Sequence, residues 1–80
     1  MEVTLVERKL GRHKADGFFN PNNNEIEIHP NLPPKRELVV TIHEFNHYLH
    51  PDWDEDKVIK FSNKMANFLW KHNFRKVKNK

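Results

Sequence analysis

Prolines fix the bounds of the central segment of this 80-residue chain. Pro33 and Pro34 are tolerated in the first turn of a helix, whereas Pro51 cannot continue one. The apolar residues between them recur at intervals of three and four, at Leu38, Val39, Ile42, Phe45 and Leu49. We therefore predict one helix over residues 33–50, inside a single domain that spans residues 1–80.

This predicted helix contains a histidine–glutamate motif, His43-Glu44-Phe45-Asn46-His47. Residues four apart lie one turn apart on the same helix face, so His43 and His47 can bind one metal ion. Glu44 then lies beside the metal, where a carboxylate can accept a proton from zinc-bound water. The motif predicts zinc as cofactor, the two histidines as ligands and Glu44 as the catalytic residue. The alternative is an ordinary histidine pair on an amphipathic helix.

A zinc peptidase usually supplies a third protein ligand, and the candidates follow the motif. They are His50, Asp52, Asp54, Glu55 and Asp56. His50 lies about 10.5 Å from His43 along a straight helix axis, too far to share one ion. The acidic residues are better placed, because the chain must reverse there. Asp54 is a natural N-cap and Asp56 points away from the next apolar stripe, so we predict Glu55 as the ligand and keep the others as alternatives. The remaining alternative is that the acidic residues only form a solvated helix N-terminus.

The residues before the helix, 1–30, predict strands. The segment 2–9 alternates around Val3 and Leu5, and the segment 25–29 alternates with Ile26 and Ile28 on one side. A loop over 11–17 and an asparagine-rich turn over 20–24 separate them, so we predict a β-hairpin with both isoleucines facing inward. We expect the edge of the 25–29 strand to be exposed and able to add an extended peptide.

A second helix is predicted over residues 54–74, with Asp54 as its N-cap. Its apolar residues recur at helical spacing and are predicted to form core against the first helix and the sheet. They are Val58, Phe61, Met65, Phe68 and Leu69. The predicted fold class is α+β, with a small antiparallel sheet or β-hairpin packed on two helices.

Composition excludes several classes of protein. The chain has no cysteine, so it can form neither disulfides nor a thiolate zinc site. Charges at Glu2, Glu7 and Arg8 are not typical of a signal peptide, and no apolar run reaches membrane-spanning length. We therefore predict a cytoplasmic protein with no membrane partner. The net charge of +3 depends on Lys71 and the basic tail 75–80, which is either a solvated helix end or a nucleic-acid contact.

Four stretches of the chain carry a resemblance to a known family. They are the residues 16–21, 25–28, 42–47 and 50–58. In these stretches the chain is similar to small metallopeptidases encoded by bacteriophages and prophages, which in turn resemble the minimal zincin core of SprT-like proteins. The resemblance implies a hairpin or small sheet packed on two helices, zinc bound by His43 and His47, and Glu44 as the catalytic carboxylate.

The resulting functional prediction is a zinc-dependent metallopeptidase that hydrolyses a peptide or protein substrate, in the host cytoplasm if the chain is encoded by a phage. Two alternatives stay open. One is a zincin-fold protein without turnover that binds or inhibits a host protein, in which zinc adds folding free energy. The other is a nucleic-acid-associated protein that uses its basic tail and loses affinity steeply as salt increases.

Overall fold

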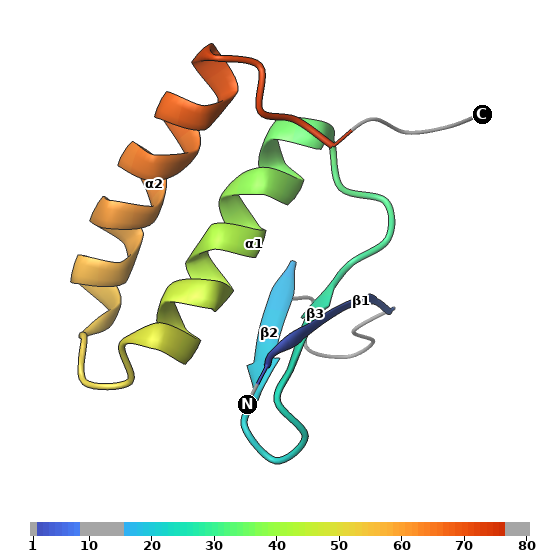
Figure 1. Ribbon diagram of the computed structural model, residues 1–80, viewed down its shortest axis with the longest axis vertical. Helices are drawn as coiled ribbons and strands as arrows, with labels where there is room; N and C mark the ends of the chain where they lie inside the picture. Colours follow the sequence, from blue (N-terminus) through green and yellow to red (C-terminus); the bar gives the residue numbers. More distant parts are fainter. Residues whose placement is uncertain (1, 9–15, 77–80) are drawn as a thin grey trace.

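The computed structural model describes residues 2–8 and 16–76, in which three strands precede two helices (Figure 1). The elements are β1 (Thr4–Glu7), β2 (Gly17–Asn20), β3 (Glu25–Ile28), α1 (Pro34–Leu49) and α2 (Glu55–Lys71). The predicted α+β class is confirmed. Most of the loop predicted over 11–17 and the last four residues of the tail lie outside the described residues. None of the described helices is both long and apolar enough to cross a membrane.

The sheet is mixed, with the strand order β1-β3-β2. β2 and β3 form the predicted antiparallel hairpin, in which Phe19 lies opposite Ile26. Their turn contains Asn24 at a φ of 57°, a left-handed conformation that asparagine tolerates better than most residues. β1 pairs with β3 in parallel, so the prediction of an antiparallel sheet is wrong for this strand. Alternation within residues 2–9 indicates a strand but says nothing about its direction relative to a partner.

β3 is the central strand, which overturns the expectation of an exposed edge on residues 25–29. Both of its edges are occupied, one by β1 and the other by β2. Among residues 2–8 and 16–76, no strand pairs with the outer edge of β2, and β2 also contacts α1. Any strand addition near the helices must therefore use β2 and not β3.

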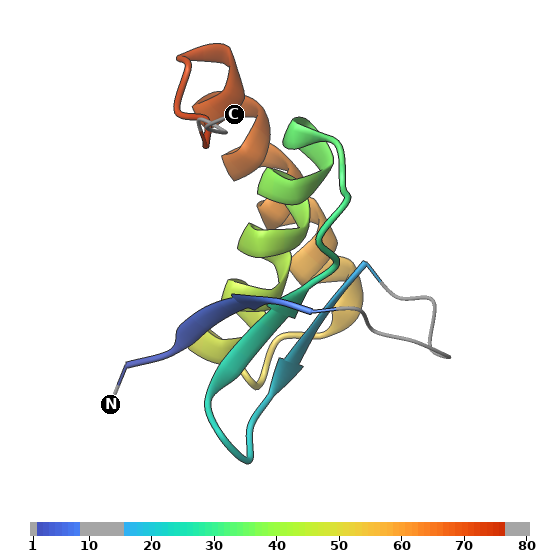
Figure 2. The same cartoon turned by 90° about the vertical axis from the view of Figure 1, so that its right-hand side faces the viewer.

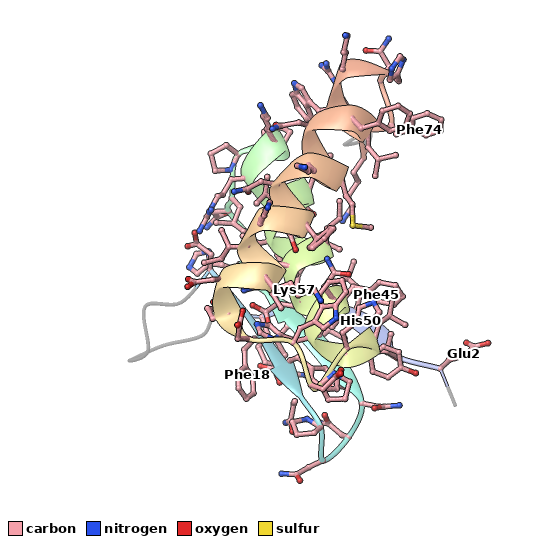
Figure 3. All side chains as sticks on the ribbon, turned by 90° about the vertical axis from the view of Figure 1, so that its left-hand side faces the viewer. Glu2, Phe18, Phe45, His50, Lys57 and Phe74 are labelled. Atoms are coloured by element: carbon pink, nitrogen blue, oxygen red, sulfur yellow. The ribbon has the colours of Figure 1, made fainter. Side chains whose placement is uncertain are left out.

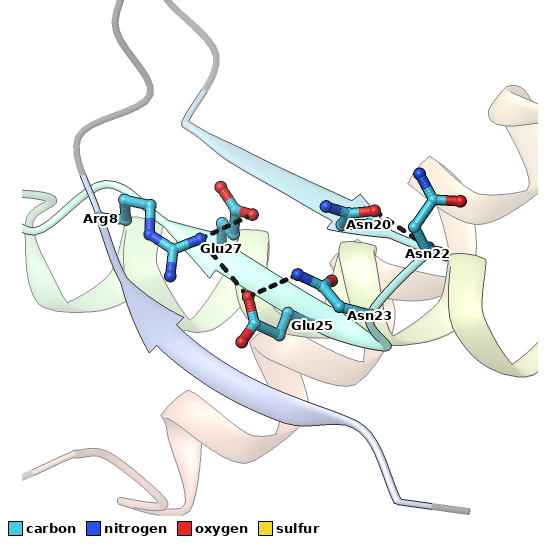
Figure 4. A network of polar contacts seen from close by, with 6 residues as sticks. All are labelled: Arg8, Asn20, Asn22, Asn23, Glu25 and Glu27. Carbon is cyan, nitrogen blue, oxygen red and sulfur yellow. Dashed lines mark hydrogen bonds and ion pairs between the residues drawn. The ribbon is translucent and has the colours of Figure 1, made fainter.

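The two faces of the sheet differ in polarity because successive residues of a strand point to opposite sides. Ile26 and Ile28 face α1 and are buried together with Val40. On the other face, the Arg8 guanidinium lies 3.4 Å from the Glu25 carboxylate and 3.0 Å from that of Glu27 (Figure 4). The sheet therefore contributes one face to the core, while the other carries this ion-paired group together with the exposed ring of Phe18.

α1 lies between the sheet and α2, as the two perpendicular views show (Figures 1 and 2). Asn46 of α1 is 2% exposed and faces α2, where its amide nitrogen donates to the Ser62 hydroxyl at 2.9 Å. Val58 and Ala66 lie on the same buried side of α2 as Ser62. These small side chains allow the two helices to approach each other closely.

The predicted core stripe of α2 is wrong in part. Val58 is fully buried, but Phe61, Met65 and Phe68 are 38%, 45% and 61% exposed. The buried positions are instead Val58, Ser62 and Ala66, spaced by four residues. A serine and an alanine add little to a hydrophobic pattern, so the larger side chains beside them indicate the wrong face.

α2 ends at Lys71 and not at residue 74 as predicted. Asn73 adopts a φ of 67° and its backbone N–H donates to the Trp70 carbonyl at 3.1 Å. The next N–H, of Phe74, donates to the Leu69 carbonyl at 2.9 Å. This pair of bonds is a Schellman motif, which satisfies the last carbonyl groups of the helix and stops it.

Candidate metal centre

Two histidine side chains of α1 converge on the side that faces α2. His43 and His47 lie one helical turn apart, and their Nε2 atoms are 3.2 Å from each other. Their rings meet edge to face, with centroids 4.9 Å apart. Both side chains are partly buried, at 19% and 31% exposed. The spacing of the motif therefore produces the convergence that the sequence predicts.

The carboxylate of Glu55 completes the cluster. One of its oxygens, Oε2, lies 3.2 Å from His43 Nε2, and the other, Oε1, lies 2.9 Å from His47 Nε2. Glu55 is the first residue of α2, and its position follows from the cap that starts this helix. The Asp54 side chain accepts a hydrogen bond from the Lys57 backbone N–H at 2.8 Å, as predicted for an N-cap.

The donor set and its spacing fit a divalent metal ion. One ligand atom from each of His43, His47 and Glu55 lies within 4.8 Å of the other two. Zinc binds histidine nitrogen and carboxylate oxygen at about 2.0–2.2 Å in a tetrahedral arrangement, which places neighbouring ligand atoms about 3.4 Å apart. The observed separations of 2.9–3.2 Å are close to that value. Three protein ligands also leave the fourth tetrahedral position free.

Glu44 lies beside this cluster and not within it. Burial raises the pKa of its carboxyl group above the ordinary value of 4.5. The neighbouring His43 and His47 oppose that rise, Glu55 adds to it, and a hydrogen bond from the Phe19 backbone lowers it. A carboxyl group with a raised pKa, next to a candidate metal, suits general acid–base chemistry.

A cleft of about 370 Å³ opens beside the cluster. His43, Glu44 and Glu55 line it. Apolar side chains from both helices also line it, namely Val39, Val40 and Ile59. Arg36 and Asp16 are part of the lining too, joined by an ion pair of 2.7 Å. The cleft is thus bounded by reactive groups, apolar side chains and one charged pair.

β2 reaches this cleft through Gly17, its first residue. The His29 N–H donates to the Asp16 carbonyl at 2.9 Å, which makes these two residues a hydrogen-bonded pair of the hairpin. Such pairs alternate along an antiparallel ladder, so Phe18 turns its backbone groups toward β3 and Phe19 turns them outward. The hydrogen bond between the Phe19 backbone and Glu44 agrees with this direction.

Gly17 packs closely against α1. A Cβ atom there would overlap Val40 Cγ1 and lie 3.3 Å from Glu44 Cγ. The sequence predicts Gly17 only as part of a loop and of a stretch that resembles phage metallopeptidases. It gives no indication that Gly17, Arg36 or Asp16 lies at the site. Their proximity depends on how β2 packs on α1, for which the sequence contains no local signal.

The other predicted ligand candidates lie outside the cluster. The His50 ring stacks on Trp53 with centroids 3.8 Å apart, just beyond the end of α1. Asp54 is used as the helix cap. Within the described part of the chain, the group of ligand atoms around His43 includes neither Asp52 nor Asp56.

Comparisons with protein families, curated proteins and solved structures found no match to this chain. The functional assignment therefore depends on the geometry of the site. The resemblance to phage metallopeptidases stays a prediction from the sequence.

Proposed function

We propose that this protein is a minimal zinc-dependent metallopeptidase. The observation that carries the proposal is the position of Glu44 next to three convergent ligand atoms, at a cleft that is open to solvent. Zinc, when bound, supplies Lewis-acid chemistry that acidifies a water molecule and stabilises negative charge on the substrate carbonyl. His43, His47 and Glu55 are the residues that would hold it.

The proton transfers are assigned to Glu44. Its carboxylate accepts a proton from the attacking water and returns it to the leaving amine of the cleaved peptide bond. The raised pKa makes the carboxylate a stronger base toward the attacking water, and it keeps the carboxyl group protonated at a pH closer to neutrality until the proton is returned. The hydrogen bond from the Phe19 backbone orients the Glu44 carboxyl group, which still lines the cleft.

The substrate that suits this site is an extended peptide. Apart from the Phe19 N–H, which is bonded to Glu44, the outward backbone groups of β2 can pair with such a peptide as an added strand, which would run past Glu44. The apolar side chains of Val39, Val40 and Ile59 suit an apolar substrate side chain next to the cleaved bond. The proposed binding edge for the substrate is thus that of β2 and not that of β3.

The test combines zinc binding with cleavage of unfolded casein. We expect wild-type protein to cleave casein with zinc, to stop when a chelator is added, and to resume when zinc is restored. Glu44→Gln should reduce cleavage by at least about 100-fold and leave zinc affinity within a few-fold of wild type. Glu55→Gln should weaken zinc binding at least about tenfold. Asp56→Asn is the matched control, because its carboxylate lies in the same helical turn but outside the cluster.

Two results would contradict the proposal in different ways. Cleavage that survives Glu44→Gln would exclude this residue as the base. Zinc binding with no cleavage by wild-type protein would exclude peptidase activity toward unfolded proteins and favour the alternative of a metal-stabilised binding protein.

A further inference from the structure

A row of alternating lysine and phenylalanine residues runs along α2, away from the metal cluster. The row consists of Lys57, Phe61, Lys64, Phe68 and Lys71. Its members follow one another at intervals of four and three, so they share one line on the helix surface. All five are exposed, and Phe68 reaches 61%. Two phenyl rings on an exposed helix line need a physical explanation.

The row borders an apolar surface to which both helices contribute. The Met65 sulfur lies 3.7 Å from Asn46 Nδ2, where the flanks of α2 and α1 meet. Beyond this contact, Phe45 and Leu49 of α1 are 39% and 48% exposed. We call the surface of Phe45, Leu49, Phe61, Met65 and Phe68 the apolar face.

The apolar face lies on one side of the molecule. Figure 3 shows Phe45 on the same side as Phe74, whose side chain is 63% exposed, and Phe18 on the opposite side. The cleft lies away from the apolar face, because Glu55 and Ile59 occupy the other flank of α2. The apolar face is therefore separate from the candidate metal centre.

The charge beside the apolar face is positive. From residue 57 to residue 80 the sequence contains eight lysines and arginines and no aspartate or glutamate. In the described part of that segment, Lys60, Lys64 and Lys71 form no ion pair, whereas Lys76 pairs with Glu7 and Glu37. The unpaired lysines are available to an anionic partner.

This combination of groups fits an anionic lipid surface. Lysine stems can extend so that the ammonium groups reach lipid phosphates while the neighbouring rings enter the acyl boundary. Protein interfaces, by contrast, are enriched in arginine and depleted in lysine, and the row contains only lysine. A second copy docked by two-fold symmetry would bring the lysine rows of both copies close together. Single-stranded nucleic acid can stack on phenyl rings but does not cover Met65 and Leu49.

We infer that the apolar face, with the lysines of α2, binds the surface of an anionic phospholipid bilayer, and that α2 lies parallel to the bilayer plane. The inference departs from the expectation, drawn from the sequence, of no membrane partner. The reason is that the apolar residues of α1 and α2 form one surface only after the two helices pack. The inference does not depend on the proposed peptidase activity.

The experiment is co-sedimentation of the full chain with lipid vesicles. We expect binding to vesicles of phosphatidylcholine and phosphatidylglycerol, much weaker binding to vesicles of phosphatidylcholine alone, and loss of binding as salt increases. Lys64→Gln should lower the partition coefficient about fivefold. Phe68→Gln should lower it roughly tenfold. Both side chains are exposed, so circular dichroism should show an unchanged fold.

The matched controls remove the same groups from other faces. Arg8→Gln removes a positive charge from the outer face of the sheet, and Phe18→Gln removes a phenyl ring that is 50% exposed on the opposite side. Both controls should bind within about twofold of wild type. The inference is overturned by equal binding to neutral and anionic vesicles, or by controls that weaken binding as much as Lys64→Gln and Phe68→Gln. A protein that binds no vesicles also overturns the inference. This holds equally if the protein instead binds oligothymidylate or dimerises through the apolar face.

Discussion

Replacing Gly17 with alanine should destabilise the fold and disturb the site together. The new Cβ would overlap Val40 Cγ1 and lie 3.3 Å from both Glu44 Cγ and Ile28 Cδ1. Val40 is buried, and a β-branched side chain in a helix has one strongly preferred rotamer, so it cannot turn away at low cost. The overlap must therefore be relieved by moving β2 away from α1.

The expected loss of stability follows from this overlap. Adding a methyl group to a packed core costs about 1–3 kcal/mol. In a domain of this size, each kcal/mol lowers Tm by roughly 4–8 °C. We expect Gly17→Ala to lower Tm by roughly 4–24 °C, measured by circular dichroism on metal-free protein. A shift of β2 would also weaken the bond between the Phe19 backbone and Glu44, so casein cleavage should fall more than zinc affinity.

A double-mutant cycle tests the stated cause. Val40→Ala removes the atom that the new Cβ would meet, so Gly17→Ala should cost at least about 1 kcal/mol less in that background than in wild type. Phe18→Ala is the control, since it changes the next residue of β2 on the other face of the sheet and should not couple to Val40→Ala. Additive costs of Gly17→Ala and Val40→Ala, or a Gly17→Ala variant as stable as wild type, would refute the reasoning.

Two further predictions concern buried polar groups. The pKa of the Glu44 carboxyl is raised mainly by burial, so the folded state holds its proton more tightly than the unfolded state, and stability falls as pH rises through the raised pKa. Metal-free Glu44→Gln should therefore have a higher Tm than the wild type at neutral pH. The difference in Tm should vanish below pH 4.5, the ordinary pKa of this group. Equal Tm values at neutral pH would contradict burial as the cause of the raised pKa. Ser62→Ala should cost about 1–3 kcal/mol in urea unfolding, because it leaves the buried Asn46 amide without its 2.9 Å acceptor. Asn46→Leu combined with Ser62→Ala should recover most of that loss, and a double variant no more stable than Ser62→Ala would argue against the hydrogen bond as the cause.

The parts of the fold that the sequence predicted correctly depend on local rules. Prolines bracket α1, asparagines form the β2–β3 turn, and Asp54 caps α2. The convergence of His43 and His47 is also local, since it requires only a helical turn. Glu55 required one further step, the reversal of the chain after Pro51, and the structure brings its carboxylate to both rings.

The features that the sequence did not reveal depend on how elements pack. Ser62 and Ala66 form the seam between the helices, although neither contributes to an apolar pattern. The direction of β1 and the central place of β3 are settled by pairing between segments, which periodicity within one segment does not encode. The free edge near the site was therefore assigned to β3 instead of β2.

The seam between the helices also connects stability to the site. Glu55 reaches the two histidines because small side chains and the Asn46–Ser62 bond hold α2 close to α1. Among the described residues only five apolar side chains are buried, which is a small core for 80 residues. A metal shared by both helices would restrain that seam directly, and at 100 times its Kd it would stabilise the fold by about 2.7 kcal/mol. The protein should therefore show its largest gain in Tm on adding zinc when α2 is packed on α1 as in the wild type. Glu55→Gln, which weakens zinc binding at least about tenfold, should remove about half of that gain or more.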